Sequence, residues 1–159
     1  MGAAAIRRAT VGDAARLNAA LRELSRSMGD AHRASDADIA RAGFGPVPAF
    51  HALIAEQADG STCGVALFSP VYSTVRGKAG AYVSDLWVAE AARGQGLGAR
   101  LLAQVLAQGG RDWGAAFLRL AVYDDNPRAR DFYERLGFGA HADETYLTLD
   151  GPALDALKG

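Results

Sequence analysis

Residues Arg93–Gly98 place three glycines between a segment typical of a buried strand and one typical of an amphipathic helix. Backbone N–H groups at a helix start, with the positive end of the helix dipole, attract an anion, and glycines allow close approach. Each N–H to phosphate hydrogen bond contributes about 1.5–3 kcal/mol. A Walker loop needs Gly-Lys-Ser/Thr and a dinucleotide fingerprint needs a further glycine at Ala99 or Leu101, so neither fits. The segment predicts a phosphate cradle of another kind, or a plain turn before a surface helix.

The hydrophobic pattern around this loop predicts alternating strands and helices. Thr10 with Asp13, and Ser35 with Asp38, have the spacing of helix capping boxes. The predicted elements are a strand from Ile6, helices after Thr10 and Ser35, strands 50–56, 63–69 and 81–88, a helix 96–111 stopped by Gly109 and Gly110, a strand 116–123, a helix 127–137, a strand 145–149 and a short helix 153–157. We therefore expect an α/β fold with a mixed sheet and helices on both faces.

Size and charge exclude several classes of partner. The 159 residues, 50% of them hydrophobic, suit a single domain spanning residues 1–159. The 17 basic and 18 acidic residues are mixed along the chain, so we expect neither nucleic acid nor a membrane as a partner. No apolar run approaches the ~18 residues of a membrane span, and Cys63 is the only cysteine, so it has no disulfide partner. We expect a cytoplasmic protein.

Two further segments give the glycine-rich loop a context. Tyr82–Val88 before it and Asn126–Phe138 after it resemble, in order and spacing, segments of the GNAT superfamily of N-acetyltransferases. The resemblance implies a single-domain GNAT fold, mostly antiparallel, with acetyl-CoA as co-substrate. It also implies which residues contact the coenzyme: Leu86, Trp87 and Val88 at the pantetheine, Arg93, Gly94, Gln95, Gly96, Leu97, Gly98 and Ala99 around the pyrophosphate, and Asn126 and Arg130 beyond them.

A closer resemblance covers nearly the whole chain. Residues 43–45, 50–56, 72–78 and 85–88 are similar to those of the diamine acetyltransferases, which acetylate spermidine, spermine and related amines. This implies a homodimer and a small amine as acceptor, with Ser84, Asp85 and Tyr72 as substrate-binding candidates. The family usually has Glu where this chain has Ser84, and a Tyr-Glu pair near Ser27 and Met28 is missing. Asp30, Asp36 or Asp38 could replace the missing carboxylates, so a polyamine stays a candidate, and a diamine or a thialysine-like amino acid is as good a one.

Two residues are candidates for proton transfer. A primary amine with a pKa of about 10.4 is protonated at neutral pH, so transfer requires a route for its proton. Asp85 is the first candidate, acting directly, through water or by holding the cation; a strand-end acid in an ion pair is the alternative. Tyr133 matches the general acid of the resembled family, and packing beside Phe132 and Phe138 is its alternative. A bulge in the strand would leave open whether Ser84 or Asp85 faces the cleft.

Other functions stay open at this stage. The same fold acetylates protein or peptide amines and aminoglycosides, and a coenzyme A-binding sensor without turnover is a further class. The diamine-like segment 72–78 favours a small amine, and Tyr133 with Asp85 favours turnover. His32, His51 and His141 lack the spacing of metal ligands, so we expect no metal.

Overall fold

Five strands form one sheet in the order β1-β2-β3-β4-β5, antiparallel from β1 to β4 and parallel between β4 and β5. This computed structural model describes residues 2–159, so Met1 of the expected domain lies outside the described residues. The strands are β1 (Ala5–Arg8), β2 (His51–Glu56), β3 (Thr62–Ser73), β4 (Lys78–Val88) and β5 (Leu118–Leu120). The pairing confirms the expected mixed, mostly antiparallel sheet.

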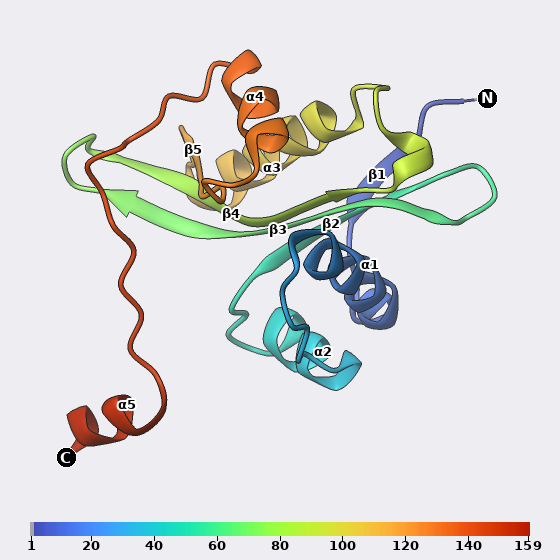
Figure 1. Cartoon of the computed structure of the whole chain (residues 1–159). Helices are drawn as coiled ribbons and strands as arrows, with labels where there is room; N and C mark the ends of the chain where they lie inside the picture. Colours follow the sequence, from blue (N-terminus) through green and yellow to red (C-terminus); the bar gives the residue numbers. More distant parts are fainter. Residues whose placement is uncertain (1) are drawn as a thin grey trace. The chain divides into compact units, whose positions relative to one another are not determined.

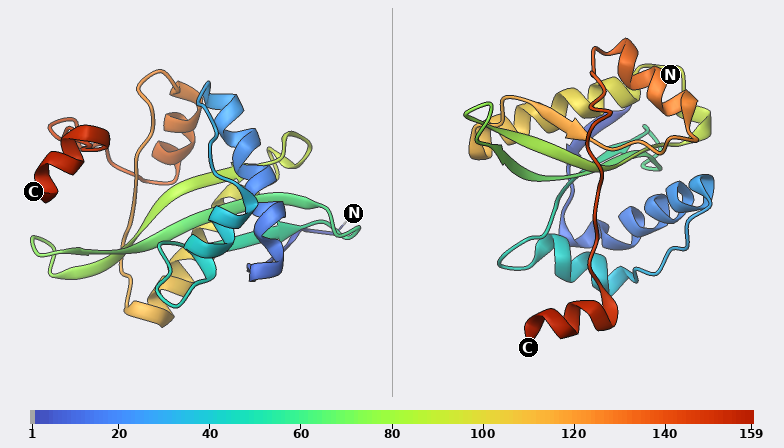
Figure 2. Two further views of the ribbon diagram at one scale, coloured as in Figure 1. Left: turned by 90° about the horizontal axis from the view of Figure 1, so that it is seen from below. Right: turned by 60° about the vertical axis from the view of Figure 1, so that its left-hand side comes forward.

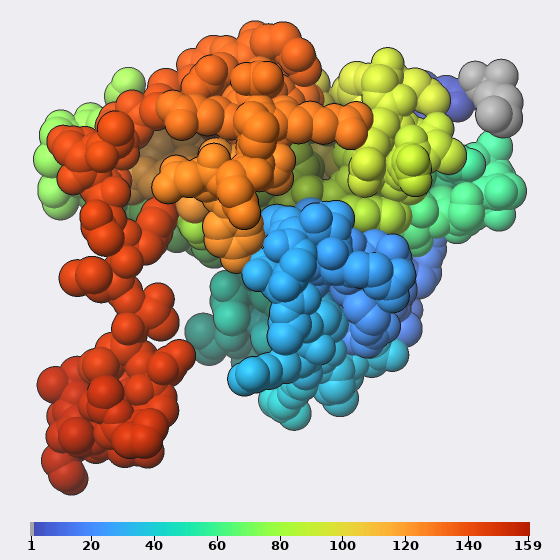
Figure 3. Space-filling model, in the orientation of Figure 1, coloured from blue at the N-terminus to red at the C-terminus, as the bar shows by residue number. Residues whose placement is uncertain are grey.

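Helices cover both faces of this sheet, as expected (Figure 1). One face carries α1 (Ala14–Met28) and α2 (Asp36–Phe44), and the other carries α3 (Leu97–Trp113). The short 3-10 turns η1 (Val11–Asp13) and η2 (Glu90–Ala92) precede α1 and the glycine-rich loop. Residues 29–35, which connect α1 to α2, lie at the molecular surface (blue in Figure 3).

The core is built from the apolar faces of α1 and the sheet. Leu17 and Leu21 of α1 are buried against Ile54, Val65 and Leu67 of the sheet. Both capping boxes predicted at the starts of these helical segments are present, at Thr10 and at Ser35. The capping boxes and the spacing of the leucines thus explain why α1 and α2 start where they do and which side of α1 they bury.

The β3–β4 hairpin is longer than the sequence pattern predicts. β2 ends its pairing with β3 at Phe68, whereas β3 and β4 stay paired with each other as far as Ser73 and Lys78 (Figure 2). The segment 72–78 was expected as a loop, but only residues 74–77 form the turn. Gly77 there has φ +61°, a backbone conformation that favours glycine.

The chain divides into two compact units, one reaching to Ala121 and a second spanning Val122–Gly159. The second unit contains α4 (Pro127–Arg135) and α5 (Gly151–Lys158). The strand expected at 145–149 was wrong: the described second unit contains no strand, and Tyr146 and Leu147 are exposed. An extended segment becomes a strand only when another strand pairs with its backbone. The single domain over residues 1–159 stays a prediction.

The predicted stop of α3 at Gly109 and Gly110 was also wrong. The helix continues to Trp113 and ends at Gly114, which has φ +75°. A Cβ on Gly109 would lie 3.0 Å from the side chains of both Trp113 and Ala115. The glycine therefore makes room for the returning chain, and only the later glycine supplies the left-handed cap.

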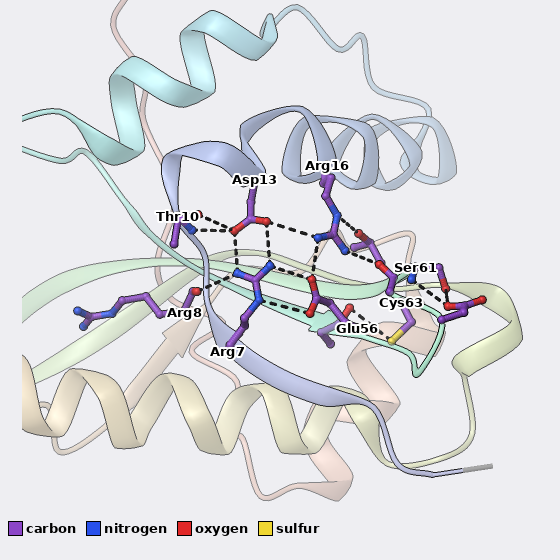
Figure 4. Close-up of polar contacts among 12 residues, drawn as sticks. Arg7, Arg8, Thr10, Asp13, Arg16, Glu56, Ser61 and Cys63 are labelled. Carbon is purple, nitrogen blue, oxygen red and sulfur yellow. Dashed lines mark hydrogen bonds and ion pairs between the residues drawn. The ribbon is translucent and has the colours of Figure 1, made fainter.

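A charged network ties β1 to the start of α1 and to the β2–β3 hairpin (Figure 4). Arg7 donates to both carboxylate oxygens of Asp13, at 2.8 and 2.9 Å, and to Glu56 at 2.8 Å. Arg16 adds a 2.7 Å bond to Glu56 and a 2.9 Å bond to the hydroxyl of Thr62. The guanidinium of Arg7 holds the pKa of the buried Asp13 far below its usual range. This network fixes the N-terminal end of α1 on the sheet.

Candidate active site

A β-bulge in β4 carries the predicted acid. Leu67 of β3 pairs with Asp85 and Phe68 pairs with Val83, so Ser84 has no partner in the register. Leu67 belongs to the core beneath α1 and α2, and residues opposite each other in a sheet share a face, so Asp85 lies on that face. The hydroxyl of Ser84 donates to Asp85 Oδ2 at 2.8 Å. The sequence pattern left open whether this strand has a bulge, and the structure shows that it does. The bulge places the side chains of Ser84 and Asp85 within hydrogen-bond distance of each other.

The surroundings of Asp85 have opposing effects on its pKa. Burial raises the pKa of Asp85, while the hydrogen bond from Ser84 and the nearby His32 lower it. His32 lies on the α1–α2 connection and was not expected at this site. Its partners are residues of α1, so its neighbours in the sequence carry no signal of its role.

The edge of β4 that follows the bulge is open to a ligand. β5 pairs only with Ala81–Val83, whereas β4 continues to Val88. The backbone N–H of Ala89 donates to Cys63 O of β3 at 2.9 Å. Because the direction of the backbone groups alternates along an antiparallel strand, the N–H and C=O of Trp87 also point to β3, whereas those of Leu86 and Val88 point to the opposite edge. Among the described strands none pairs with that edge beyond Val83. It offers amide groups spaced as in a strand to an extended ligand.

The three expected pantetheine residues therefore differ in what they offer. Leu86 and Val88 present backbone groups to the open edge, and the carbonyl of Val88 also accepts from Arg93 Nε at 3.1 Å. Trp87 packs its side chain against the core. We conclude that Leu86 and Val88 are better placed for a strand-like contact than Trp87.

The glycine-rich loop forms the start of α3, as predicted. Gly94 and Gly96 have φ +77° and +75°, and Gly96 is the N-cap of the helix. The first N–H groups of a helix have no intrahelical acceptor, so those of Leu97, Gly98 and Ala99 are available to an anion. Gln95 bonds the backbone of η2 through its side chain. The loop thus has the backbone geometry of an anion cradle, next to the open end of β4.

The second unit holds three of the predicted residues, Asn126, Arg130 and Tyr133. Asn126 caps α4 by accepting from Ala129 N–H at 3.2 Å, and Arg130 pairs with Glu134 at 2.8 Å on an exposed face. The ring of Tyr133 packs edge-on against Phe132 and Phe138, with centroids 5.1 and 5.5 Å apart. Burial raises the pKa of Tyr133, so its phenol stays protonated at neutral pH. Tyr133 can donate a proton, but whether it shares a site with Asp85 stays a prediction.

Tyr72 does not join Asp85 within one copy of the chain. It lies in the ribbon beyond β2, pairs with Ala79 and is 65% exposed. Ala79 is six residues from Asp85 along β4, which corresponds to roughly 20 Å of strand. Among residues 2–159 no cluster of His, Cys, Asp or Glu is arranged to hold a metal ion. None of the described helices is long and apolar enough to span a membrane.

Comparison with known proteins relates the chain to acetyltransferases in sequence and to a solved structure in fold. Residues 17–138 match the model of the Acetyltransferase (GNAT) family. The chain is 36% identical over 141 residues to the thialysine N-epsilon-acetyltransferase of Bos taurus, covering 83% of this chain and 82% of that protein. It is 36% identical over 105 residues to spermidine/spermine N(1)-acetyltransferase-like protein 1 of Homo sapiens, covering 61% of this chain and 15% of that protein. An integron cassette protein from the mobile metagenome of V. cholerae shares the fold, with a TM-score of 0.79 and 23% identity over 99% of both chains.

Proposed function

The chain belongs to the GNAT family of acetyltransferases and is an N-acetyltransferase, and from this premise we propose that it transfers acetyl from acetyl-CoA to the side-chain amine of a small, thialysine-like amino acid or diamine. The observation that carries the proposal is the open edge of β4, which has Asp85 at one end and the glycine-rich loop at the other. Acetyl-CoA supplies a thioester, whose carbonyl carbon is attacked by the amine.

The residues at this edge fit the coenzyme by an observation independent of the family. Pantetheine carries amide groups that hydrogen-bond as a strand does, and the backbone groups of Leu86 and Val88 face that direction. The pyrophosphate requires N–H donors, which the start of α3 provides behind Gly94 and Gly96. Arg93, Asn126 and Arg130 are proposed as additional polar contacts to the coenzyme.

The acceptor needs a group that takes or directs its proton. We assign this to Asp85, because it is a partly buried carboxyl beside the open edge and Ser84 donates to it. The ammonium ion first gives one proton to Asp85 or to water held by it, because only the neutral amine has a lone pair. As the amine nitrogen then bonds to the acetyl carbon, the carbon–sulfur bond breaks, a second proton leaves the nitrogen for water, and the departing sulfur takes a proton. Tyr133 is proposed as the donor of the proton that the sulfur takes.

The absence of a second carboxylate at Ser84 favours an acceptor with a single cationic side chain. Polyamines carry several positive charges that require several nearby carboxylates, and Ser84 supplies none where the diamine acetyltransferases have Glu. The three thialysine N-epsilon-acetyltransferases among the relatives are 33% to 36% identical to the chain. A thialysine-like side chain presents one amine for one carboxylate, which matches Asp85. We also propose a homodimer in the cytoplasm.

The test is release of free coenzyme A, followed with a thiol reagent, with thialysine, lysine, ornithine, putrescine, spermidine, spermine, a lysine peptide and an aminoglycoside as acceptors. Reactions without an amine measure thioester hydrolysis, and mass spectrometry identifies the acetylated nitrogen. We expect the highest kcat/KM with an amino acid or diamine. Binding of acetyl-CoA without turnover on any amine would show a sensor instead, and a preference for the peptide or the aminoglycoside would refute the acceptor class. Light scattering checks the dimer.

A further inference from the structure

Two arginine side chains lie over the aromatic ring of Phe117. The guanidinium carbons of Arg76, in the β3–β4 turn, and of Arg119, in β5, lie 5.4 and 5.3 Å from the ring centroid. An aromatic ring attracts a guanidinium group, but it does not neutralise the charge. Among residues 2–159 no carboxylate lies within ion-pair distance of either arginine. Two uncompensated positive charges therefore lie together at the start of β5.

The sheet register places Arg119 on the same face as Asp85. Asp85 pairs with Leu67 on the face that α1 covers, and residues paired across a sheet share a face. Tyr82 pairs with Ser69, which follows Leu67 by two residues and so lies on that face too. Arg119 pairs with Tyr82. Asp85, Tyr82 and Arg119 therefore project from one face of the sheet.

The bulge in β4 brings this arginine close to the acid. Tyr82 and Asp85 are three residues apart in the sequence, but their partners on β3 are two residues apart. With ~3.3 Å of rise per residue and ~4.8 Å between strands, the Cα atoms of Arg119 and Asp85 lie roughly 8 Å apart. The ring of Phe117 lies over Gly80, where an added Cβ would approach it to 2.6 Å. The guanidinium of Arg119 is thus directed along the strand away from Asp85, and a gap of roughly 8–12 Å separates the two charged groups.

A lysine-like amino acid has the length to span this gap. With bonds of ~1.5 Å, the extended side chain of lysine or thialysine holds its amine nitrogen roughly 7.5 Å from the carboxyl carbon. A hydrogen bond at each end adds ~3 Å. The ammonium group can therefore meet Asp85 while the carboxylate meets Arg119. Both side chains belong to residues that are only partly buried, so a ligand has access to them.

Starting from the acetyltransferase function proposed above, we propose that Arg119 binds the α-carboxylate of an amino-acid acceptor whose side-chain amine lies at Asp85. A guanidinium binds a carboxylate through paired, charge-assisted hydrogen bonds. Arg76 adds a second positive charge over the same ring. These two cations repel the far end of a diamine or polyamine, which carries a positive charge where the amino acid has its carboxylate. The acceptor is thus an amino acid with a side-chain amine, rather than a diamine or a polyamine.

The first test compares acceptors that differ at the carboxylate. Lysinamide replaces the carboxylate of lysine by a neutral amide, and cadaverine lacks both the carboxylate and the α-amine. We expect kcat/KM for lysine to exceed that for either compound at least ~10-fold, because a charged hydrogen-bond partner is lost. Equal kcat/KM for lysine and lysinamide in the wild-type protein would overturn the proposal, and this comparison requires no variant to fold.

The second test changes the arginine. Arg119→Gln should lower kcat/KM for lysine at least ~10-fold more than kcat/KM for lysinamide. Arg119→Glu puts a carboxylate in place of the cation and should reverse the preference in favour of cadaverine. The matched control is Arg22→Gln, at an exposed arginine of α1, which should leave the ratio of lysine to lysinamide unchanged. If Arg119→Gln lowers activity equally with all three acceptors, the arginine only stabilises the strand and the proposal is wrong.

A third readout needs no turnover. Saturation-transfer NMR of lysine and lysinamide, with coenzyme A present, compares their binding to the wild-type protein and to Arg119→Gln. We expect lysine to bind more tightly to the wild type and the difference to vanish in the variant, and equal binding to the wild type would overturn the inference. If this difference is found but no amine is acetylated, the carboxylate site stands and the proposed function fails. If amines are acetylated without regard to the carboxylate, the proposed function stands and the carboxylate site fails.

Discussion

Replacement of Asp13 by Asn tests the charged network that fixes α1. Asn has the same shape but places an amide among donors: Arg7 at 2.8 and 2.9 Å and the backbone N–H of Thr10 at 2.8 Å. Hydrogen bonds to charged groups contribute about 1.5–3 kcal/mol. The side chain of Arg7 is 40% exposed and keeps its bond to Glu56, so only part of the free energy of these hydrogen bonds is lost in the variant. We expect about 2 kcal/mol of destabilisation, and a fall in Tm of roughly 4–8 °C for a chain of this size.

The pH dependence of that loss follows from the sign of the pKa shift. The folded pKa of Asp13 lies below its ordinary value, so its contribution is fully present above the unfolded pKa and is lost as the pH falls through the folded value. The difference between wild type and Asp13→Asn should be constant above about pH 5 and should shrink below about pH 4.

The assay is urea unfolding followed by circular dichroism across this pH range. Glu23→Gln is the matched control, because it removes an exposed ion pair to Arg26 of 2.9 Å and should cost less than about 0.5 kcal/mol. A loss below about 0.5 kcal/mol at neutral pH for Asp13→Asn would refute the role of the network. A larger loss that persists unchanged in acid would assign the effect to packing rather than charge.

Three further predictions concern the site. Gly96→Val should weaken acetyl-CoA binding at least about tenfold by calorimetry because it strains a backbone at φ +75°; Gly114→Val, with the same φ, should spare affinity, and equal loss in both would refute the cradle. Tyr133→Phe keeps the ring contacts and should lower kcat while leaving acetyl-CoA affinity unchanged; full activity would remove Tyr133 from proton transfer. Asp85→Asn should lower kcat/KM for the amine about 100-fold or more in steady-state kinetics, whereas Asp38→Asn, at a half-exposed carboxylate of α2, should not. An Asp85→Asn variant that stays active would leave proton removal to water.

The parts of the fold that follow from local rules could be predicted from the sequence. The capping boxes at Thr10 and Ser35 and the start of a helix at the glycine-rich loop depend on residues within a few positions of one another, and all three are present. The prediction at Gly109 was wrong, because the role of this glycine is set by the side chains that pack against it, those of Trp113 at the end of the same helix and of Ala115 beyond it. Whether a glycine ends a helix or makes room for a neighbour depends on tertiary structure.

The candidate site shows the same limit. Asp85 and the glycine-rich loop follow from a motif, but the side that Asp85 faces depends on the register with Leu67, which only the paired strand determines. His32 could not be predicted, because its two partners, Asn18 and Ser25, lie on a helix that ends before it. The position of its ring depends on how the α1–α2 connection packs on α1.

The early end of β5 has a consequence for how such an enzyme can change over time. If a ligand is bound by hydrogen bonds to the peptide groups of Leu86 and Val88, substitution of side chains on β4 does not remove those hydrogen bonds. The acyl donor would then be specified by the course of the main chain, and the acceptor by side chains such as that of Ser84. New acceptor preferences could arise by point mutation at the bulge without loss of the donor, which makes the interrupted sheet a source of evolvability as well as a binding surface.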